Sequence, residues 1–162
     1  MTVAELVAHH GAELVADDTL AVVLGENCAS ATPTESVSWL LPESRRALGF
    51  DADDVVAKVP IEPARVAQRE VALGALVLLV FDDAIDAPKL RRLRGHDALG
   101  GLVPSVVRFI LDEPERHRRE LEQLNRLLSC VPVYELARPR RLEQLAATGE
   151  VLRALAESGG KA

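Results

Sequence analysis

Two pairs of adjacent aspartates follow apolar stretches of the chain. Asp17 and Asp18 end the sequence AELVADD, and Asp82 and Asp83 end LGALVLLVFDD. A strand that ends in a carboxylate can present it at the edge of a sheet, where it could hold Mg²⁺ beside the phosphates of a nucleotide. A second carboxylate next to it could orient or deprotonate a hydroxyl group. Each pair is therefore a candidate catalytic or metal site, and a solvated strand end is the alternative for either one.

Other common catalytic motifs do not occur in the sequence. It contains no GxxxxGK[ST] loop to cradle phosphates, and no HxxxH or HExxH. Ser105 and Ser129 lack a GxSxG context, and Cys28 and Cys130 form no CxxC. These absences leave nucleophilic hydrolysis and structural zinc unsupported.

Charge is distributed unevenly along the 162 residues. The net charge of −6 divides into −10 for residues 1–87, +5 for residues 88–141 and −1 for residues 142–162. A basic region on an acidic protein often marks an anionic partner. For residues 114–128, the alternative is the solvated face of an amphipathic helix.

Composition and the N-terminal residues bear on location and partners. The longest apolar run, residues 71–81, is too short to span a bilayer, and MTVAEL has no basic region or cleavage site typical of a signal peptide. We therefore expect a cytoplasmic protein with no membrane partner. An aromatic content of 3% and the acidic net charge disfavour nucleic acid as a partner.

Hydrophobic periodicity predicts an α/β fold with a mixed sheet. The predicted helices cover residues 2–11, 42–49, 96–111, 114–129 and 140–155. The predicted strands cover residues 12–16, 19–25, 54–62, 71–81 and 131–136, of which 71–81 is the expected central strand. Residues 26–36 are small and polar and are predicted to form a loop. We expect one domain over residues 1–157 and a flexible tail over 158–162.

Histidines at the end of the first predicted helix are a weaker candidate site. His9 and His10 are adjacent, so on a helix their side chains point about 100° apart and do not chelate as an i,i+4 pair does. A cation near a helix C-terminus interacts favourably with the helix dipole, which is the simpler interpretation.

The order of these segments resembles a known family. A helix, GAELVADD, a polar loop, WLLPESRRALG, a strand with a lysine, an apolar strand, LRRL, VPVYELARP and a closing helix resemble the HPr kinase/phosphorylase C-terminal domain. They are more similar to the small HPr-kinase-related serine kinases of bacteria. The resemblance covers nearly the whole chain and is most specific at GAELVADD and VPVYEL. It implies a fold like that of P-loop kinases and phosphoenolpyruvate carboxykinase.

The resemblance also implies site residues. Asp17 and Asp18 would be the phosphoryl-transfer carboxylates: one would accept the proton of a substrate serine and the other would help hold Mg²⁺, with ATP as the phosphate donor. Met1 stands where the hydroxyl residue of the P-loop would be, and Thr2 lies just behind it as a nucleotide-binding residue. Asp82 and Asp83 would then be a solvated loop.

The chain departs from this family at the phosphate cradle, which would precede Met1. Either the sequence is N-terminally truncated relative to a protein with a P-loop, or it is a remnant without ATP chemistry. The first hypothesis is an ATP-dependent protein serine kinase that could assemble as a homo-oligomer and whose partner is an acceptor protein bearing a serine. The second is a non-catalytic module that binds an acidic protein through the basic region. Its arginines are Arg91, Arg92, Arg94, Arg116, Arg118 and Arg119.

Overall fold

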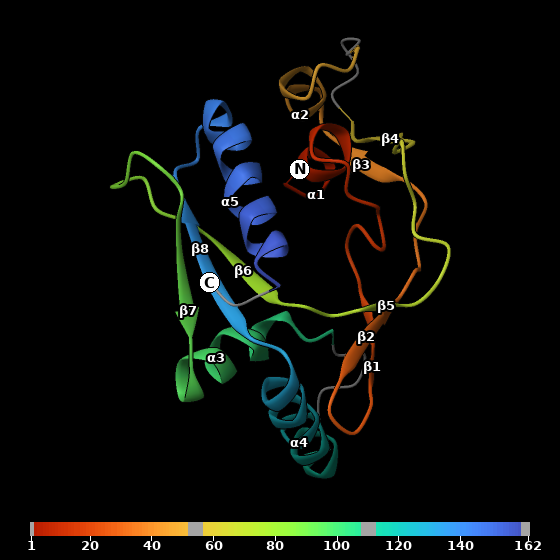
Figure 1. Cartoon of the computed structure of the whole chain (residues 1–162), viewed down its shortest axis with the longest axis vertical. Coiled ribbons are helices and arrows are strands. Elements are labelled where there is room, and N and C mark those ends of the chain that lie inside the picture. The colour runs from red at the N-terminus through yellow and green to blue at the C-terminus, as the bar shows by residue number, and fades with distance from the viewer. Residues whose placement is uncertain (1, 52–56, 108–112, 160–162) are drawn as a thin grey trace.

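A computed structural model of the chain describes residues 2–51, 57–107 and 113–159 (Figure 1). Within these residues, helices combine with the strands of three small sheets, so the predicted mixed α/β class is confirmed. Two clusters of buried apolar side chains form its core.

The first sheet combines parallel and antiparallel pairing. Its strand order is β6 (Leu76–Phe81), β8 (Val133–Arg138) and β7 (Lys89–Leu93). β8 pairs parallel with β6 on one side and antiparallel with β7 on the other. Four of the six residues of β8 are buried, as expected for a strand with neighbours on both edges.

β6 lies at the edge of this sheet, so the prediction of a central strand over residues 71–81 is wrong. That segment is divided between β5 (Val71–Ala72), which belongs to another sheet, and β6. Leu79 and Phe81 of β6 are 48% and 53% exposed. An apolar run favours a strand, but the contacts of that strand with distant segments decide which place it takes in a sheet.

Helices α3 (Gly95–Leu102) and α4 (Pro114–Cys130) contribute to a core shared with this sheet. Its buried members are Leu93, Ala98, Leu102, Leu124 and Val133. At Gly101, a Cβ atom would lie 2.4 Å from a methyl group of Leu78, so the glycine allows close approach of α3 to β6. The helix predicted over residues 96–111 ends early: α3 stops at Leu102, and a short 3₁₀ turn that contains Pro104 follows it (η1, Val103–Ser105). Residues 108–111 lie outside the described ranges.

A second core joins α1 (Thr2–His9), β3 (Ser38–Leu40), α2 (Pro42–Ala47) and α5 (Leu145–Glu157). Its buried members are Ala4, Leu40, Leu48 and Leu145, with Phe50 and Ile61 packed against them. The helix predicted over residues 42–49 is confirmed: α2 begins at Pro42, and Gly49 follows with a φ of +78°. β3 pairs antiparallel with β4 (Val59–Ile61); residues 54–56 of the predicted strand 54–62 are not described.

The third sheet is a hairpin of β1 (Ala21–Leu24) and β2 (Ala29–Thr32), with β5 beside β2. β1 confirms the predicted strand over residues 19–25. The loop predicted over residues 26–36 is wrong where it covers β2, because small residues with no apolar pattern still pair through their backbone with β1 and β5. The predicted strand over residues 12–16 is reduced to an isolated parallel bridge between Leu14 and Val66.

The C-terminal helix is also close to the prediction. A short 3₁₀ turn (η2, Leu142–Gln144) precedes α5, which packs on α1. Ser158 closes α5 by donating its N–H to the carbonyl oxygen of Ala154 at 3.0 Å, so the described part of the predicted tail belongs to the helix end. Residues 160–162 are not described. Figure 1 shows the β6–β8–β7 sheet on one side and α1, α2, β3 and β4 on the other, with α5 between them.

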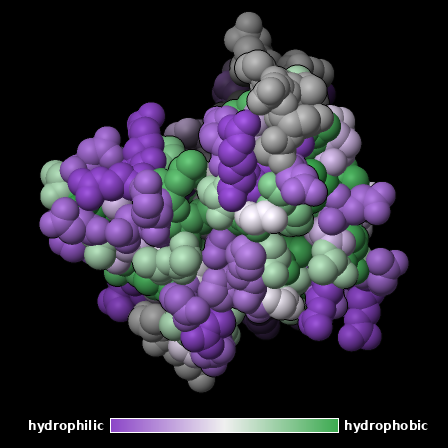
Figure 2. Space-filling view, turned by 90° about the horizontal axis from the view of Figure 1, so that it is seen from above, coloured by the Kyte–Doolittle hydropathy of each residue, from purple (hydrophilic) through white to green (hydrophobic). Residues whose placement is uncertain are grey.

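In the described part of the chain, no helix combines the length and apolar character needed to cross a membrane. Viewed from above, polar side chains cover much of the surface and apolar ones reach it between them (Figure 2).

Candidate functional site

The segment that carries Asp17 and Asp18 is anchored at Leu14. α1 ends before Gly11, whose φ of +70° turns the chain away from the helix. The N–H of Leu14 then donates to the carbonyl oxygen of Arg65 at 3.0 Å, and the Leu14 carbonyl oxygen accepts from the N–H of Ala67 at 2.8 Å. The Leu14 side chain is 0% exposed. These contacts fix the position of the backbone just before Asp17 and Asp18.

Asp17 is a partly buried residue that supports β3. Its Oδ2 atom accepts a hydrogen bond from the N–H of Trp39 at 2.9 Å. Its own N–H donates to Oε2 of Glu35 at 2.8 Å. The Asp17 carboxylate is therefore held in one place by a backbone group 22 residues away, with Oδ1 left for another contact.

Asp18 differs from its neighbour because it is exposed and has no hydrogen bond or ion pair to any residue of the described ranges. It lines a cleft of about 730 Å³ between β1, β6 and α4. Other charged residues on the cleft wall are Glu120 and Arg126. The aspartate pair thus consists of one fixed carboxylate and one that is free to contact a ligand.

Thr2 lies at the start of α1 and is 7% exposed. Among the hydrogen bonds and ion pairs of the described residues, none joins Thr2 to either aspartate. The structure therefore places Thr2 in the packed part of α1 and does not connect it to the carboxylates. Met1, the position expected for the P-loop hydroxyl residue, lies outside the described residues.

A divalent cation at this place would need ligands beyond the two aspartates. Within residues 2–51, 57–107 and 113–159, no group of three or more His, Cys, Asp or Glu side chains could hold a metal ion. Mg²⁺ usually keeps several waters and binds one or two carboxylates together with substrate phosphates. Asp18 and Oδ1 of Asp17 could serve as the one or two carboxylate ligands of such an ion. The two aspartates alone could not form a complete metal site.

Asp82 and Asp83 support the backbone at the ends of two parallel strands. Oδ1 of Asp82 accepts the N–H of Ala84 at 2.9 Å, and Oδ1 of Asp83 accepts the N–H of Arg140 at 2.9 Å. As the sequence predicted, the pair lies in a loop after β6, where Asp83 is exposed, and each carboxylate also accepts a backbone N–H there.

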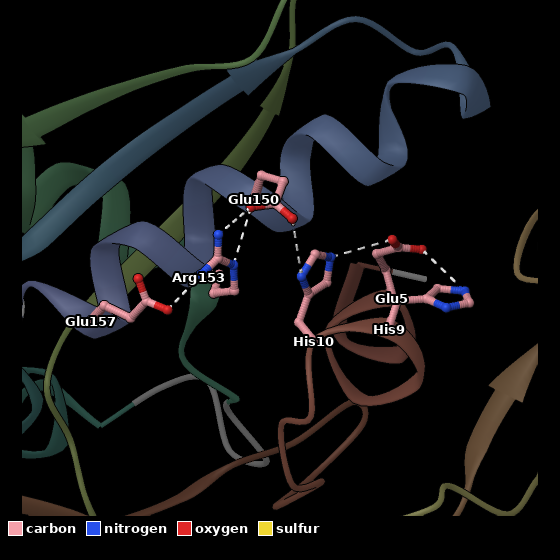
Figure 3. Close-up of polar contacts among 6 residues, drawn as sticks. All are labelled: Glu5, His9, His10, Glu150, Arg153 and Glu157. Atoms are coloured by element: carbon pink, nitrogen blue, oxygen red, sulfur yellow. Dashed lines mark hydrogen bonds and ion pairs between the residues drawn. The ribbon is translucent and has the colours of Figure 1, made fainter.

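Polar side chains also meet between α1 and α5 (Figure 3). Glu5 is buried on α1, and its two carboxylate oxygens face the two histidines at the end of the helix. Oε1 lies 3.5 Å from Nε2 of His10, and Oε2 lies 4.0 Å from Nε2 of His9. The two imidazoles thus share one carboxylate, which the adjacent-residue pattern did not reveal.

His10 also contacts α5, because its Nδ1 atom lies 3.6 Å from Oε1 of Glu150. Gly149 allows this contact: a Cβ atom there would lie 2.5 Å from Nε2 of His10. On the solvent side, a hydrogen bond from Arg153 holds the pKa of Glu150 below its ordinary value. The network therefore connects the end of α1 to the exposed face of α5.

Several arginines of the predicted basic surface are already neutralised by nearby carboxylates. Arg91 forms an ion pair with Glu135 at 3.0 Å, and Arg118 pairs with Glu115 at 2.6 Å. Arg116 pairs with Glu113 at 2.7 Å. The remaining arginines of that set, Arg92, Arg94 and Arg119, are exposed and have no ion pair with any described residue.

Comparison with protein-family models, with curated proteins and with solved structures finds no match to the chain.

Sequence reasoning missed Glu5 and Ser38, a serine of β3 that lines an apolar pocket. Glu5 is one acidic residue in an ordinary helix, and Ser38 is one small residue beside Trp39. Neither belongs to a motif, so only the packing of α1 against β3 and α5 distinguishes them.

Proposed function

We propose that the chain carries the acidic residues of a phosphoryl-transfer site of the HPr-kinase-related type, acting as an ATP-dependent protein serine kinase. The observation that supports this best is the unequal environment of the aspartate pair. Asp17 is fixed by the Trp39 N–H, and Asp18 is free on the wall of an open cleft. A fixed and a free carboxylate side by side can divide positioning and ligand contact between them.

In this proposal Asp18 is the carboxylate that contacts the reacting groups. It is open to a divalent cation or to a serine hydroxyl, and Asp17 holds the backbone that presents it. When bound, Mg²⁺ would neutralise negative charge on the transferring phosphoryl group. Two adjacent carboxylates repel each other, and a cation between them relieves that repulsion.

Nucleotide affinity should be weak in this chain. The sequence contains no GxxxxGK[ST] loop, and the backbone N–H groups of such a loop normally provide much of the phosphate binding. We therefore expect binding of Mg²⁺ and ATP only at millimolar concentration.

Calorimetric titration of the chain with ATP in the presence of Mg²⁺ tests the proposal. We expect weak, saturable, Mg²⁺-dependent binding that Asp18→Asn abolishes and that Asp83→Asn retains. Asp83→Asn is the matched control because it changes an aspartate of the other pair. No binding by the unmodified chain, or equal binding by the two variants, would contradict a nucleotide site at Asp18.

A protein-binding module without catalysis is the second candidate. The observation that favours it is a set of exposed arginines that form no ion pair with a described residue: Arg92 on β7, Arg94 after β7 and Arg119 on α4. An acidic protein would be the complementary partner, and its binding should weaken as salt screens the charges. Salt-insensitive binding of an acidic partner would count against this candidate.

A further inference from the structure

An apolar pocket lies between α1, α2, β3 and β4, within the second core. Its volume is about 310 Å³. Nine of its twelve lining residues are apolar, including Val7 of α1, Leu40 of β3 and Phe50 after α2. An apolar cavity of about 150 Å³ is large enough to bind benzene, so this pocket could hold a molecule of about two fused rings.

One buried hydroxyl group on the pocket wall has no partner. Ser38 is 3% exposed, and its Oγ atom makes no hydrogen bond to any described residue. β3 alternates between buried Ser38 and Leu40 and exposed Trp39, so Ser38 faces inward with the core residue Leu40. A buried polar group without a partner costs free energy, and its presence in a folded protein calls for an explanation.

Water does not explain this hydroxyl group well. A buried water molecule usually needs two to four polar partners, and most of this wall is apolar. The other polar side chains that line the pocket are His9 and Glu62, and both residues are exposed. A ligand with its own polar group could satisfy Ser38 while its apolar part fills the remaining volume.

We propose that this pocket is a binding site for a small, neutral, largely apolar molecule that carries one hydroxyl group. The ligand hydroxyl would exchange a hydrogen bond with Oγ of Ser38, and its apolar part would lie against Val7, Leu40 and Phe50. The ligand is neutral because no charged side chain is buried on the wall. This site is separate from Asp18, which lines the cleft between β1, β6 and α4.

The probe for this site is 2-naphthol, with naphthalene as its match without the hydroxyl group. Both are titrated into the full chain while methyl signals are followed by NMR. We expect 2-naphthol to shift the methyl signals of Val7, Leu40 and Ile61 with a dissociation constant of about 0.1 mM or tighter. The methyl signals of Leu79 and Val80, which are exposed on β6, should not move.

Two variants test separately the contribution of the hydrogen bond and that of the pocket volume to binding. Ser38→Ala should weaken 2-naphthol binding about five- to tenfold and leave naphthalene binding unchanged, because it removes only the hydroxyl group. This variant should fold, since the hydroxyl group it removes has no partner. Ala64→Phe adds volume at the pocket wall and should abolish binding of both probes, whereas Ala87→Phe, at an exposed loop position away from the pocket, should not.

Three results would overturn the proposal. Unshifted Val7 and Ile61 signals at saturating 2-naphthol would exclude the pocket as a binding site. Equal binding by Ala64→Phe and Ala87→Phe would place the probe elsewhere. An unchanged 2-naphthol affinity in Ser38→Ala would exclude the proposed ligand class. Asp18→Asn should bind 2-naphthol normally, so failure at this pocket is distinguishable from failure of the phosphoryl-transfer proposal.

Discussion

Asp17 and Asp18 follow the buried Leu14, and Asp82 and Asp83 follow the edge strand β6. In the second pair, each carboxylate accepts a backbone N–H, one from the local turn and one from the end of β8. In the first pair, Asp17 accepts the N–H of Trp39, and Asp18 has no partner among the described residues.

The second pair uses both carboxylates to bind backbone N–H groups, whereas the first pair leaves one carboxylate available to a ligand. A carboxylate that accepts a backbone N–H stabilises the fold, and removing it leaves the N–H without its partner. A carboxylate without partners contributes little to stability but remains available to a cation or a hydroxyl group. The sequence pattern is the same in both places, so the three-dimensional environment carries the distinction.

The largest effect on stability is expected for Asp17→Ala. This variant removes the acceptor of the Trp39 N–H, which donates a hydrogen bond of 2.9 Å to the charged carboxylate of the partly buried Asp17. We expect a loss of about 2 kcal/mol in the free energy of unfolding, measured by urea denaturation. A loss below about 0.5 kcal/mol would show that Asp17 does not support β3.

A smaller loss is expected for Asp83→Ala. The carboxylate accepts the Arg140 N–H at 2.9 Å, but both residues are exposed, so water can replace the lost partner in part. We expect about 1 kcal/mol by the same measurement. A loss larger than that of Asp17→Ala would contradict the expectation that the more buried aspartate contributes more to stability.

Asp18→Ala should leave the free energy of unfolding within about 0.5 kcal/mol of that of the unmodified chain, because it removes no hydrogen bond or ion pair with a described residue. The same denaturation experiment checks this expectation. A loss comparable to that of Asp17→Ala would show that Asp18 has a structural role and would remove the difference between the two aspartate pairs.

The helices were the most predictable part of the fold. Gly11 after α1 and Pro42 at the start of α2 are local signals, and α4 has a long amphipathic pattern. A helix depends mainly on its own sequence and on which of its faces is buried. These signals therefore predicted the helices well, apart from their exact ends.

Strand partners were predictable only in part. β8 was identified, but the sequence did not indicate that it would be central and β6 at the edge. β7, with the sequence KLRRL, carries three charges, and β2 consists of small residues, so neither shows an apolar alternation. Their pairing is decided by neighbours far along the chain.

The sequence identified the residues of the candidate site but did not predict the role of each one. AELVADD drew attention to Asp17 and Asp18, yet the division between them depends on Trp39, 22 residues later. The pocket depends on α1, α2, β3 and β4 meeting around Ser38. No local pattern encodes either arrangement.

The smallest effect on stability is expected at Glu150, whose carboxylate is held by a side chain instead of a backbone N–H. Arg153 lowers the pKa of Glu150 mainly through a hydrogen bond, and the charge of Arg153 adds to this. A lowered folded-state pKa means that this stabilisation is present above the ordinary range of a carboxyl group and is lost as the pH falls through the lowered value. Arg153→Gln should therefore raise the pKa of Glu150 in an NMR titration, and an unchanged pKa would contradict the proposed cause.

The most direct test of the difference between the aspartate pairs uses Mn²⁺ as a paramagnetic probe for a Mg²⁺ site, since both cations prefer oxygen ligands. With ATP present, we expect Mn²⁺ to broaden the amide NMR signals of Asp18 and Thr19 and to leave that of Ala84, beside Asp82 and Asp83, sharp. Asp18→Asn should restore the signal of Thr19. Equal broadening beside both pairs, or broadening that persists in Asp18→Asn, would contradict a cation site at the free carboxylate.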